Sequence, residues 1–169
     1  MAHKKLSLRE ATKEDCTLLF RWANDPEVRL SSLSPEPIAW EDHVAWLTKQ
    51  LADPSCHIFI ASNTAGDPVG QVRFNLQPDG SVAIDVHTAK ECRGQGYGTS
   101  LVVEALDRLF SSTDIRIVHA YQRPENTASI RVFEKAGFKS EGEIALKGHT
   151  VRHKRLPPFL SATHVVCGH

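Results

Sequence analysis

The stretch of this 169-residue sequence whose residue types best suit ligand binding is Arg93-Gly94-Gln95-Gly96-Tyr97-Gly98-Thr99. It follows a predicted strand over residues 82–88 and precedes an apolar-periodic helix. Glycines let the backbone approach a ligand closely and adopt positive φ. A helix that begins here directs its unpaired N–H groups and the positive end of its dipole at the turn. These features favour a bound phosphate.

The spacing of this stretch excludes the two common nucleotide-binding motifs. A P-loop needs G-x-x-x-x-G-K-[ST], and no lysine with a following hydroxyl stands in the required place. The Rossmann pattern G-x-G-x-x-G fails because the third glycine comes one residue early and position 99 is threonine. Arg93, Gly96 and Gly98 instead fit Arg-x-x-Gly-x-Gly. The alternative is a glycine-rich turn that only tightens a strand–helix joint.

Arg-x-x-Gly-x-Gly resembles motif A of the GNAT superfamily of N-acetyltransferases, whose loop amides hold the pyrophosphate of acetyl-CoA. A second segment, residues 124–138, resembles the motif B helix of this family and ends in Lys-Ala-Gly-Phe. The family's pantetheine-binding asparagine is matched by Asn126, which is also a candidate helix N-cap. The resemblance implies acetyl-CoA as co-substrate, no metal, and one acetyltransferase domain over residues 1–169. It assigns the cofactor contacts to Val86, His87, Thr88, Arg93, Gly94, Gln95, Gly96, Tyr97, Gly98, Thr99, Asn126 and Ser129.

In this family an amine attacks the thioester directly, so the reaction needs an unprotonated amine, an oxyanion donor and a proton for the thiolate. The resemblance places the oxyanion donor in the main chain of residues 86–88. Many members carry a tyrosine acid where this sequence has Phe133, which has no proton to give. Ser129, which matches a serine of the ribosomal-protein alanine acetyltransferase branch, and Tyr121 are the two candidate acids.

The candidate base is a pair of residues on one strand. Asp85 and His87 alternate onto the same face of the strand over residues 82–88, where they would relay a proton through water. The alternative is a polar strand face that is hydrogen-bonded to its neighbours. An acceptor amine of low intrinsic pKa would need no dedicated base.

The acceptor side is expected in the first two helices and the loop between them. Residues 19–29, 36–47 and 70–74 resemble the GNAT branch that acetylates nucleotide-linked amino sugars, although that branch usually keeps the missing tyrosine. Trp46 would stack on a base or sugar or pack in the protein, and Arg29 and Arg73 would pair with an acceptor phosphate or remain solvated. The predicted acceptor is therefore a small-molecule primary amine, and the resemblance implies that it belongs to a nucleotide-linked amino sugar. A protein N-terminus and a CoA-binding module without catalysis are the alternatives.

The composition limits the binding partners and the cellular location that we expect for this protein. The 20 basic and 20 acidic residues cancel, which argues against nucleic acid or an anionic membrane as partner. No apolar run reaches the ~18 residues of a membrane span, and the first residues lack the apolar core of a signal peptide. Cytoplasmic localisation with free thiols is expected, and a homodimer is left open. The cysteines are Cys16, Cys56, Cys92 and Cys167, and a chance histidine cluster comprises His149, His153, His164 and His169.

Periodicity and turn residues predict the elements that position these groups. Strands are expected over 6–11, 57–61, 69–76, 82–88 and 115–121 and from 138 onward, while the tail beyond Gly148 is ambiguous. Helices are expected over 12–24, where Asn24-Asp25-Pro26 stops the helix, over 37–51, after residue 98 and over 126–136. The helix after residue 98 carries the apolar residues Leu101, Val102, Ala105, Leu106 and Leu109. On the second helix the expected apolar face is Trp40, Val44, Leu47 and Leu51. The order β-α-α-β-β-β-α-β-α-β predicts a single α/β domain, and the resemblance described above implies that this domain has the GNAT fold. Its mixed, mostly antiparallel sheet would be flanked by about four helices.

Overall fold

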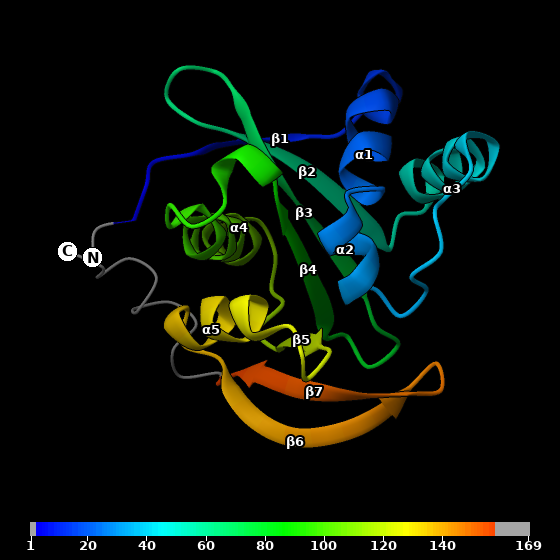
Figure 1. Ribbon diagram of the computed structural model, residues 1–169. Coiled ribbons are helices and arrows are strands. Elements are labelled where there is room, and N and C mark those ends of the chain that lie inside the picture. The colour runs from blue at the N-terminus through cyan, green and yellow to red at the C-terminus, as the bar shows by residue number, and fades with distance from the viewer. Residues whose placement is uncertain (1–2, 158–169) are drawn as a thin grey trace.

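The computed structural model describes residues 3–157, which form a seven-stranded sheet of order β1-β2-β3-β4-β5-β7-β6 (Figure 1). The β4–β5 pair is parallel and the other neighbours are antiparallel, so the predicted mixed, mostly antiparallel sheet is confirmed. The strands are β1 (Ser7–Glu10), β2 (Cys56–Ser62), β3 (Pro68–Leu76), β4 (Val82–Thr88), β5 (Val118–Gln122), β6 (Lys139–Leu146) and β7 (His149–Leu156).

Helices cover both faces of this sheet. In Figure 1, α4 and α5 lie on one side and α1, α2 and α3 on the other. Within residues 3–157 there are five α-helices and two short 3₁₀ turns, so the fold holds one α-helix more than the expected four. They are α1 (Cys16–Ala23), α2 (Pro26–Ser31), α3 (Trp40–Ala52), α4 (Tyr97–Ser112) and α5 (Thr127–Lys135), with η1 (Lys13–Asp15) and η2 (Lys90–Cys92).

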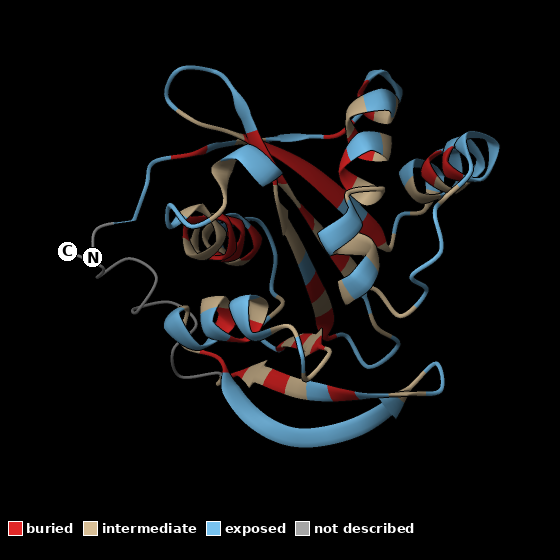
Figure 2. Cartoon of the chain, viewed as in Figure 1, coloured by how far each residue is buried: buried red, intermediate tan, exposed pale blue. Residues whose placement is uncertain are grey.

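The sheet separates two apolar cores because successive strand residues point to opposite faces. Along β2, Phe59 and Ala61 join the larger core beneath α4 and α5, whereas Ile58 and Ile60 join the smaller core beneath α1 and α3. Figure 2 shows the corresponding buried stripe on α4. As predicted, that stripe consists of Leu101, Val102, Ala105, Leu106 and Leu109.

The unexpected helix is α2. Asn24-Asp25-Pro26 stops α1 as predicted, because α1 ends at Ala23, but Asp25 and Pro26 also begin α2, which was not predicted. Asp25 is its N-cap and accepts a hydrogen bond from the Glu27 N–H at 2.9 Å, while Pro26 occupies the first turn, where its missing N–H costs nothing.

The apolar face predicted for α3 is wrong at three of its four positions and correct at Leu47. Trp40, Val44 and Leu51 are exposed, whereas His43 and Leu47 are the buried residues. His43 tolerates burial because its Nε2 lies 3.1 Å from the Cys16 carbonyl oxygen, and burial lowers the pKa of its ring. A buried histidine therefore turns the helix so that the stripe through 43 and 47 faces the sheet.

The feature that positions the site is the divergence of β4 from β5. The two strands pair only at Val82↔Val118 and Ala83↔His119, near the start of each. Beyond Ala83 one edge of β4 pairs with β3 and the other has no partner in β5. The segment whose structure the sequence left ambiguous forms β7, which pairs with β5 and β6. No helix within residues 3–157 is long and apolar enough to cross a membrane.

Candidate active site

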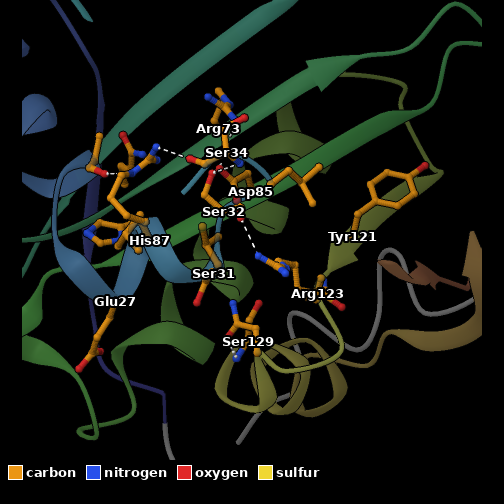
Figure 3. Close-up of a pocket in the computed structure, with 18 of the residues that line it drawn as sticks. Glu27, Ser31, Ser32, Ser34, Arg73, Asp85, His87, Tyr121, Arg123 and Ser129 are labelled. Carbon is orange, nitrogen blue, oxygen red and sulfur yellow. Dashed lines mark hydrogen bonds and ion pairs between the residues drawn. The ribbon is translucent and has the colours of Figure 1, made fainter. Parts of the chain in front are cut away.

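A cavity of about 740 Å³ opens where β4 and β5 diverge, and Figure 3 shows the residues around it. Its walls come from β3, the ends of β4 and β5, the start of α4, one face of α5, the segment from α1 to α3, and the turn between β6 and β7. Of the predicted cofactor contacts, those that line it are Val86, His87, Thr88, Arg93, Gly98, Asn126 and Ser129. Gly94, Gln95, Gly96, Tyr97 and Thr99 lie in the adjoining loop and first turn of α4.

The glycine loop leaves the start of α4 accessible. Gly94 and Gly96 have φ of +72° and +85°, and Gly96 is the N-cap of α4 with no side chain capping this end. A Cβ at Gly98 would lie 2.9 Å from Val132 Cγ2, so the missing side chain allows α4 to approach α5 closely. This end therefore offers backbone N–H groups and the helix dipole to an anion, as the diphosphate of acetyl-CoA requires.

The Arg93 side chain is held by protein groups. It donates to the Thr88 carbonyl at 3.2 Å and forms ion pairs with Glu27 at 2.7 Å and Asp25 at 3.4 Å. Arg93 thus ties the start of α2 to the end of β4. The guanidinium of Arg93 is therefore already engaged, and the backbone N–H groups at the start of α4 are the groups left open to an anion.

Asn126 performs the structural role considered for it, because its Oδ1 caps α5 by accepting from the Ser129 N–H at 3.2 Å. Both residues line the cavity. Phe133, one turn after Ser129, is 2% exposed and packs edge-to-face on Phe138, with ring centroids 5.0 Å apart. Phe133 belongs to the core beneath α4 and α5, and Ser129 is the hydroxyl that α5 presents to the cavity.

Tyr121, the other candidate acid, lies apart from Ser129. Its ring stacks on His153 at 5.0 Å and on His119 at 6.3 Å, and in Figure 3 it points away from the other labelled side chains. Burial raises the pKa of its phenol. The structure therefore places the two candidate acids on different walls of the cavity.

Asp85 and His87 share the β4 face that looks toward α1 and α3, as the alternation predicts. Asp85 pairs across the sheet with Arg73, and their side chains form an ion pair of 3.3 Å. His87 packs on Trp22, with ring centroids 5.7 Å apart, and its buried Nε2 has no hydrogen-bond partner among the described residues. Burial, assisted by the Arg93 charge, lowers the pKa of His87 to about 4, so the imidazole is neutral near pH 7.

The two arginines considered for an acceptor phosphate differ. Arg29 donates to the carbonyls of Ala23 at 2.6 Å and Ser34 at 3.0 Å, so it holds its own loop together. Arg73 keeps a buried Nε that has no partner within residues 3–157, and its guanidinium carbon lies 5.5 Å from the Trp46 ring centroid. Arg73 and Trp46 together form a cationic and aromatic wall.

Two contributors were not found by sequence reasoning. Arg123 donates to the carbonyls of Leu30 at 3.3 Å and Ser32 at 3.0 Å, so it links the β5–α5 loop to the end of α2 across the cavity (Figure 3). Gln122, the last residue of β5, is buried in the cavity wall. Neither belongs to a recognisable motif; only their position after a predicted strand end could have suggested a role.

The part of the chain that the structure describes contains no group of three or more side chains that could together ligate a metal ion. His149 and His153 lie on β7, whereas His164 and His169 are outside the described residues. Cys16, Cys56 and Cys92 are free thiols, and Cys167 is also outside the described residues.

The fold and the split-strand cavity are those of an acyltransferase, and the comparison with known families agrees. Residues 5–139 match the family model described as "Acetyltransferase (GNAT) domain". The chain therefore belongs to the GNAT acetyltransferase family, and it is an acetyl-CoA-dependent N-acetyltransferase.

Individual relatives are distant. The chain is 25% identical over 145 residues to "Uncharacterized N-acetyltransferase p20" of Bacillus licheniformis, covering 82% of each chain. It is 25% identical over 158 residues to "Aminoglycoside N(6')-acetyltransferase type 1" of Klebsiella pneumoniae, covering 85% of this chain and 78% of the relative. The solved structure of AAC(6')-Ib with ribostamycin and coenzyme A superposes with a TM-score of 0.83 at 22% identity, covering 95% of this chain and 98% of the other. That likeness establishes the fold.

Proposed function

We propose that this enzyme acetylates the primary amine of a small molecule that also carries negative charge, specifically a nucleotide-linked amino sugar. The observation that carries this proposal is the balance of charge around the cavity. Five cationic side chains line it, against three carboxylates. They are Arg29, Arg73, Arg93, Arg123 and Lys147 against Glu27, Asp42 and Asp85.

This balance disfavours a polycationic acceptor. Aminoglycosides and spermidine, the acceptors in the names of several relatives, carry several ammonium groups. Such molecules need a surplus of carboxylates, because an unpaired like charge near a cavity of reduced dielectric is costly. An acceptor that carries a nucleotide diphosphate needs a surplus of cationic side chains instead. Arg73, with its open Nε, and the face of Trp46 suit a phosphate and a base or sugar respectively.

The proposed chemistry follows from the groups around the split strands. Acetyl-CoA supplies an activated acetyl thioester. The unpaired edge of β4 at residues 86–88 offers a backbone N–H to the developing oxyanion. Neutral His87 accepts a hydrogen bond from the acceptor amine and orients it, because a pKa of about 4 makes it a weak proton carrier at neutral pH. Ser129 donates a proton to the departing thiolate and regains one from the ammonium group of the tetrahedral intermediate, so that the amine proton ends on the CoA thiol.

The shape of the cavity favours a small acceptor over a polypeptide. Arg123 donates to the carbonyls of Leu30 and Ser32, and these hydrogen bonds hold the end of α2 against the β5–α5 loop, on the far side of the cavity. An N-terminal peptide would need an open groove at this point. A second candidate function, CoA binding without turnover, is favoured by Phe133, since the core position that holds a tyrosine acid in many relatives has no ionisable group here.

Thiol release from acetyl-CoA over an acceptor panel tests the proposal. The panel contains nucleotide-linked amino sugars, kanamycin, spermidine and a peptide with an N-terminal alanine. We expect turnover with a nucleotide-linked amino sugar and a KM for it far below that for the free amino sugar. Preference for kanamycin or spermidine would contradict the charge argument, and preference for the peptide would contradict the shape argument. CoA binding without turnover of any acceptor would establish the non-catalytic module instead.

A further inference from the structure

Gln122 occupies an unusual position in the sheet. It ends β5, three residues beyond the last β5 residue that pairs with β4. Val118 and Ala120 precede it on the same strand face and are buried in the core beneath α4 and α5. Gln122 therefore points to the α4–α5 side of the gap between the strands, and it lines the cavity together with Gly98 and Ser129.

The side-chain amide of Gln122 is buried and makes no hydrogen bond among the described residues. The residue is 4% exposed, and neither Nε2 nor Oε1 has a hydrogen-bond partner within residues 3–157. Buried side-chain amides are nearly always hydrogen-bonded, since desolvation without a partner is costly. Leucine or methionine would fill this space without that cost. The retained amide thus indicates a partner that is present when the enzyme works.

A partner for Gln122 must supply both an acceptor for Nε2–H and a donor for Oε1. A secondary amide offers these two groups. The extended chain that joins the diphosphate of acetyl-CoA to its thioester contains two secondary amides. It must run from the glycine loop at the start of α4 to the unpaired edge of β4, and Gln122 lines the same cavity as Gly98 and Val86.

We propose that Gln122 is a positioning residue that pairs with a secondary amide of the pantetheine arm of acetyl-CoA. The pair fixes the arm along the gap and so sets the thioester against the unpaired edge of β4. The inference rests on the use of acetyl-CoA and is independent of the acceptor. The unpaired amide of Gln122 destabilises the ligand-free enzyme, whereas in the complex this amide is hydrogen-bonded. Gln122 therefore lowers the folding stability of the free enzyme and raises its affinity for acetyl-CoA.

The variant Gln122→Leu tests this, with calorimetry using two ligands. CoA carries the arm, whereas 3'-phosphoadenosine 5'-diphosphate carries the phosphates without it. We expect the affinity for CoA to fall about 10- to 100-fold, as for the loss of hydrogen bonds in a closed site. The affinity for the fragment should stay within about twofold, and the melting temperature of the ligand-free enzyme should rise. In kinetics, KM for acetyl-CoA should rise more than kcat falls.

Gln71→Leu is the matched control. Gln71 lines the same cavity but lies on β3 opposite His87, on the α1–α3 side, so its loss should leave CoA affinity unchanged. Unchanged CoA affinity in Gln122→Leu would overturn the proposal, because water then satisfies the amide. Equal losses for CoA and the fragment, or a lower melting temperature, would also overturn it. Gln122→Met provides the same test should the branched side chain prevent folding.

Discussion

The two halves of the cavity are built in different ways. The half that we propose to bind acetyl-CoA (the cofactor half) offers mainly main-chain groups, namely the uncapped start of α4 and the unpaired edge of β4. The acceptor half uses large side chains from separate segments, among them Trp46, Arg73 and His87. Backbone groups suit a ligand that every family member shares, whereas side chains can be exchanged without rebuilding the fold.

The halves also differ in how they are held in place. The cofactor half rests on helix packing, with Gly98 against Val132 and a capped α5. The acceptor half is attached to it by charged groups, through Arg93 to Asp25 and Glu27 at the start of α2 and through Arg123 to the end of α2. Substitutions in one half should therefore leave ligand binding in the other largely intact.

The largest effect is expected in the cofactor half, with Gly96→Leu. The new side chain strains a residue at φ +85° and projects into the space beside the start of α4. CoA affinity should fall about 100-fold or more, because the amides there can no longer reach the diphosphate. Calorimetry with CoA measures the loss.

Gly80→Leu is the control for backbone strain. Gly80 has nearly the same φ, +83°, and equally free surroundings, but it lies in the β3–β4 turn at the opposite end of β4. Both variants should lose about 1–2 kcal/mol of stability from the left-handed conformation. A comparable loss of CoA affinity in both would show that strain, and not a phosphate site, explains the Gly96 result.

The next effect is the pH dependence of folding stability that the burial of His87 in the acceptor half should cause. Its pKa is about 4 in the folded enzyme and 6.5 when unperturbed, so the unfolded chain binds the extra proton between these values. Folding stability is therefore fully present above about pH 6.5 and declines as the pH falls toward 4. Between pH 7 and pH 5 the wild-type enzyme should lose about 2 kcal/mol more than His87→Gln.

Urea unfolding at the two pH values measures this difference. His57→Gln, which replaces an exposed histidine on β2, should retain the full wild-type decline. His43, whose pKa is also lowered by burial, contributes in the same direction and remains in both variants. Equal declines in wild type and His87→Gln would contradict a buried, neutral His87.

A smaller effect is expected for Arg73→Gln. Removing the guanidinium that lies over Trp46 should raise KM for a nucleotide-linked amino sugar about 20-fold, the value of a charge-assisted contact to a phosphate. CoA affinity should not change, because Arg73 belongs to the acceptor half. Arg21→Gln, on the exposed face of α1, is the control for loss of charge. A parallel loss of CoA affinity would remove the distinction between the halves.

The same division explains what sequence could predict. The cofactor half is encoded by local sequence. Glycines before an apolar-periodic segment identify the start of α4, and the capping residue Asn126, one turn before Ile130, identifies the start of α5. The acceptor half depends on contacts distant in sequence. The bond from His43 to the Cys16 carbonyl turns α3, and Arg93 takes Glu27 as partner over 66 positions. No local pattern specifies either contact.

Gln122 and β7 extend this lesson. Gln122 ends an ordinary buried strand, and its significance arises only because β4 diverges from β5 beside it. The strand β7 alternates poorly in hydrophobicity because Lys154 is buried on it, paired with Glu134 of α5 at 2.9 Å. A buried lysine contradicts the pattern of an apolar strand face, so the sequence left this segment ambiguous.

The smallest effect is expected at the two candidate acids, which lie on different walls of the cavity. A thiol of ordinary pKa near 8.5 is a fair leaving group, so protonation assists its departure only modestly. Ser129→Ala should therefore lower kcat only about fivefold at pH 7, with little change by pH 9, where the thiolate leaves unprotonated. Tyr121→Phe should change kcat by less than about twofold at either pH, because the phenol is stacked on His153 and directed away from Ser129. Steady-state thiol release at the two pH values distinguishes the hydroxyls, and a greater loss in Tyr121→Phe would place the proton donor on β5 instead of α5.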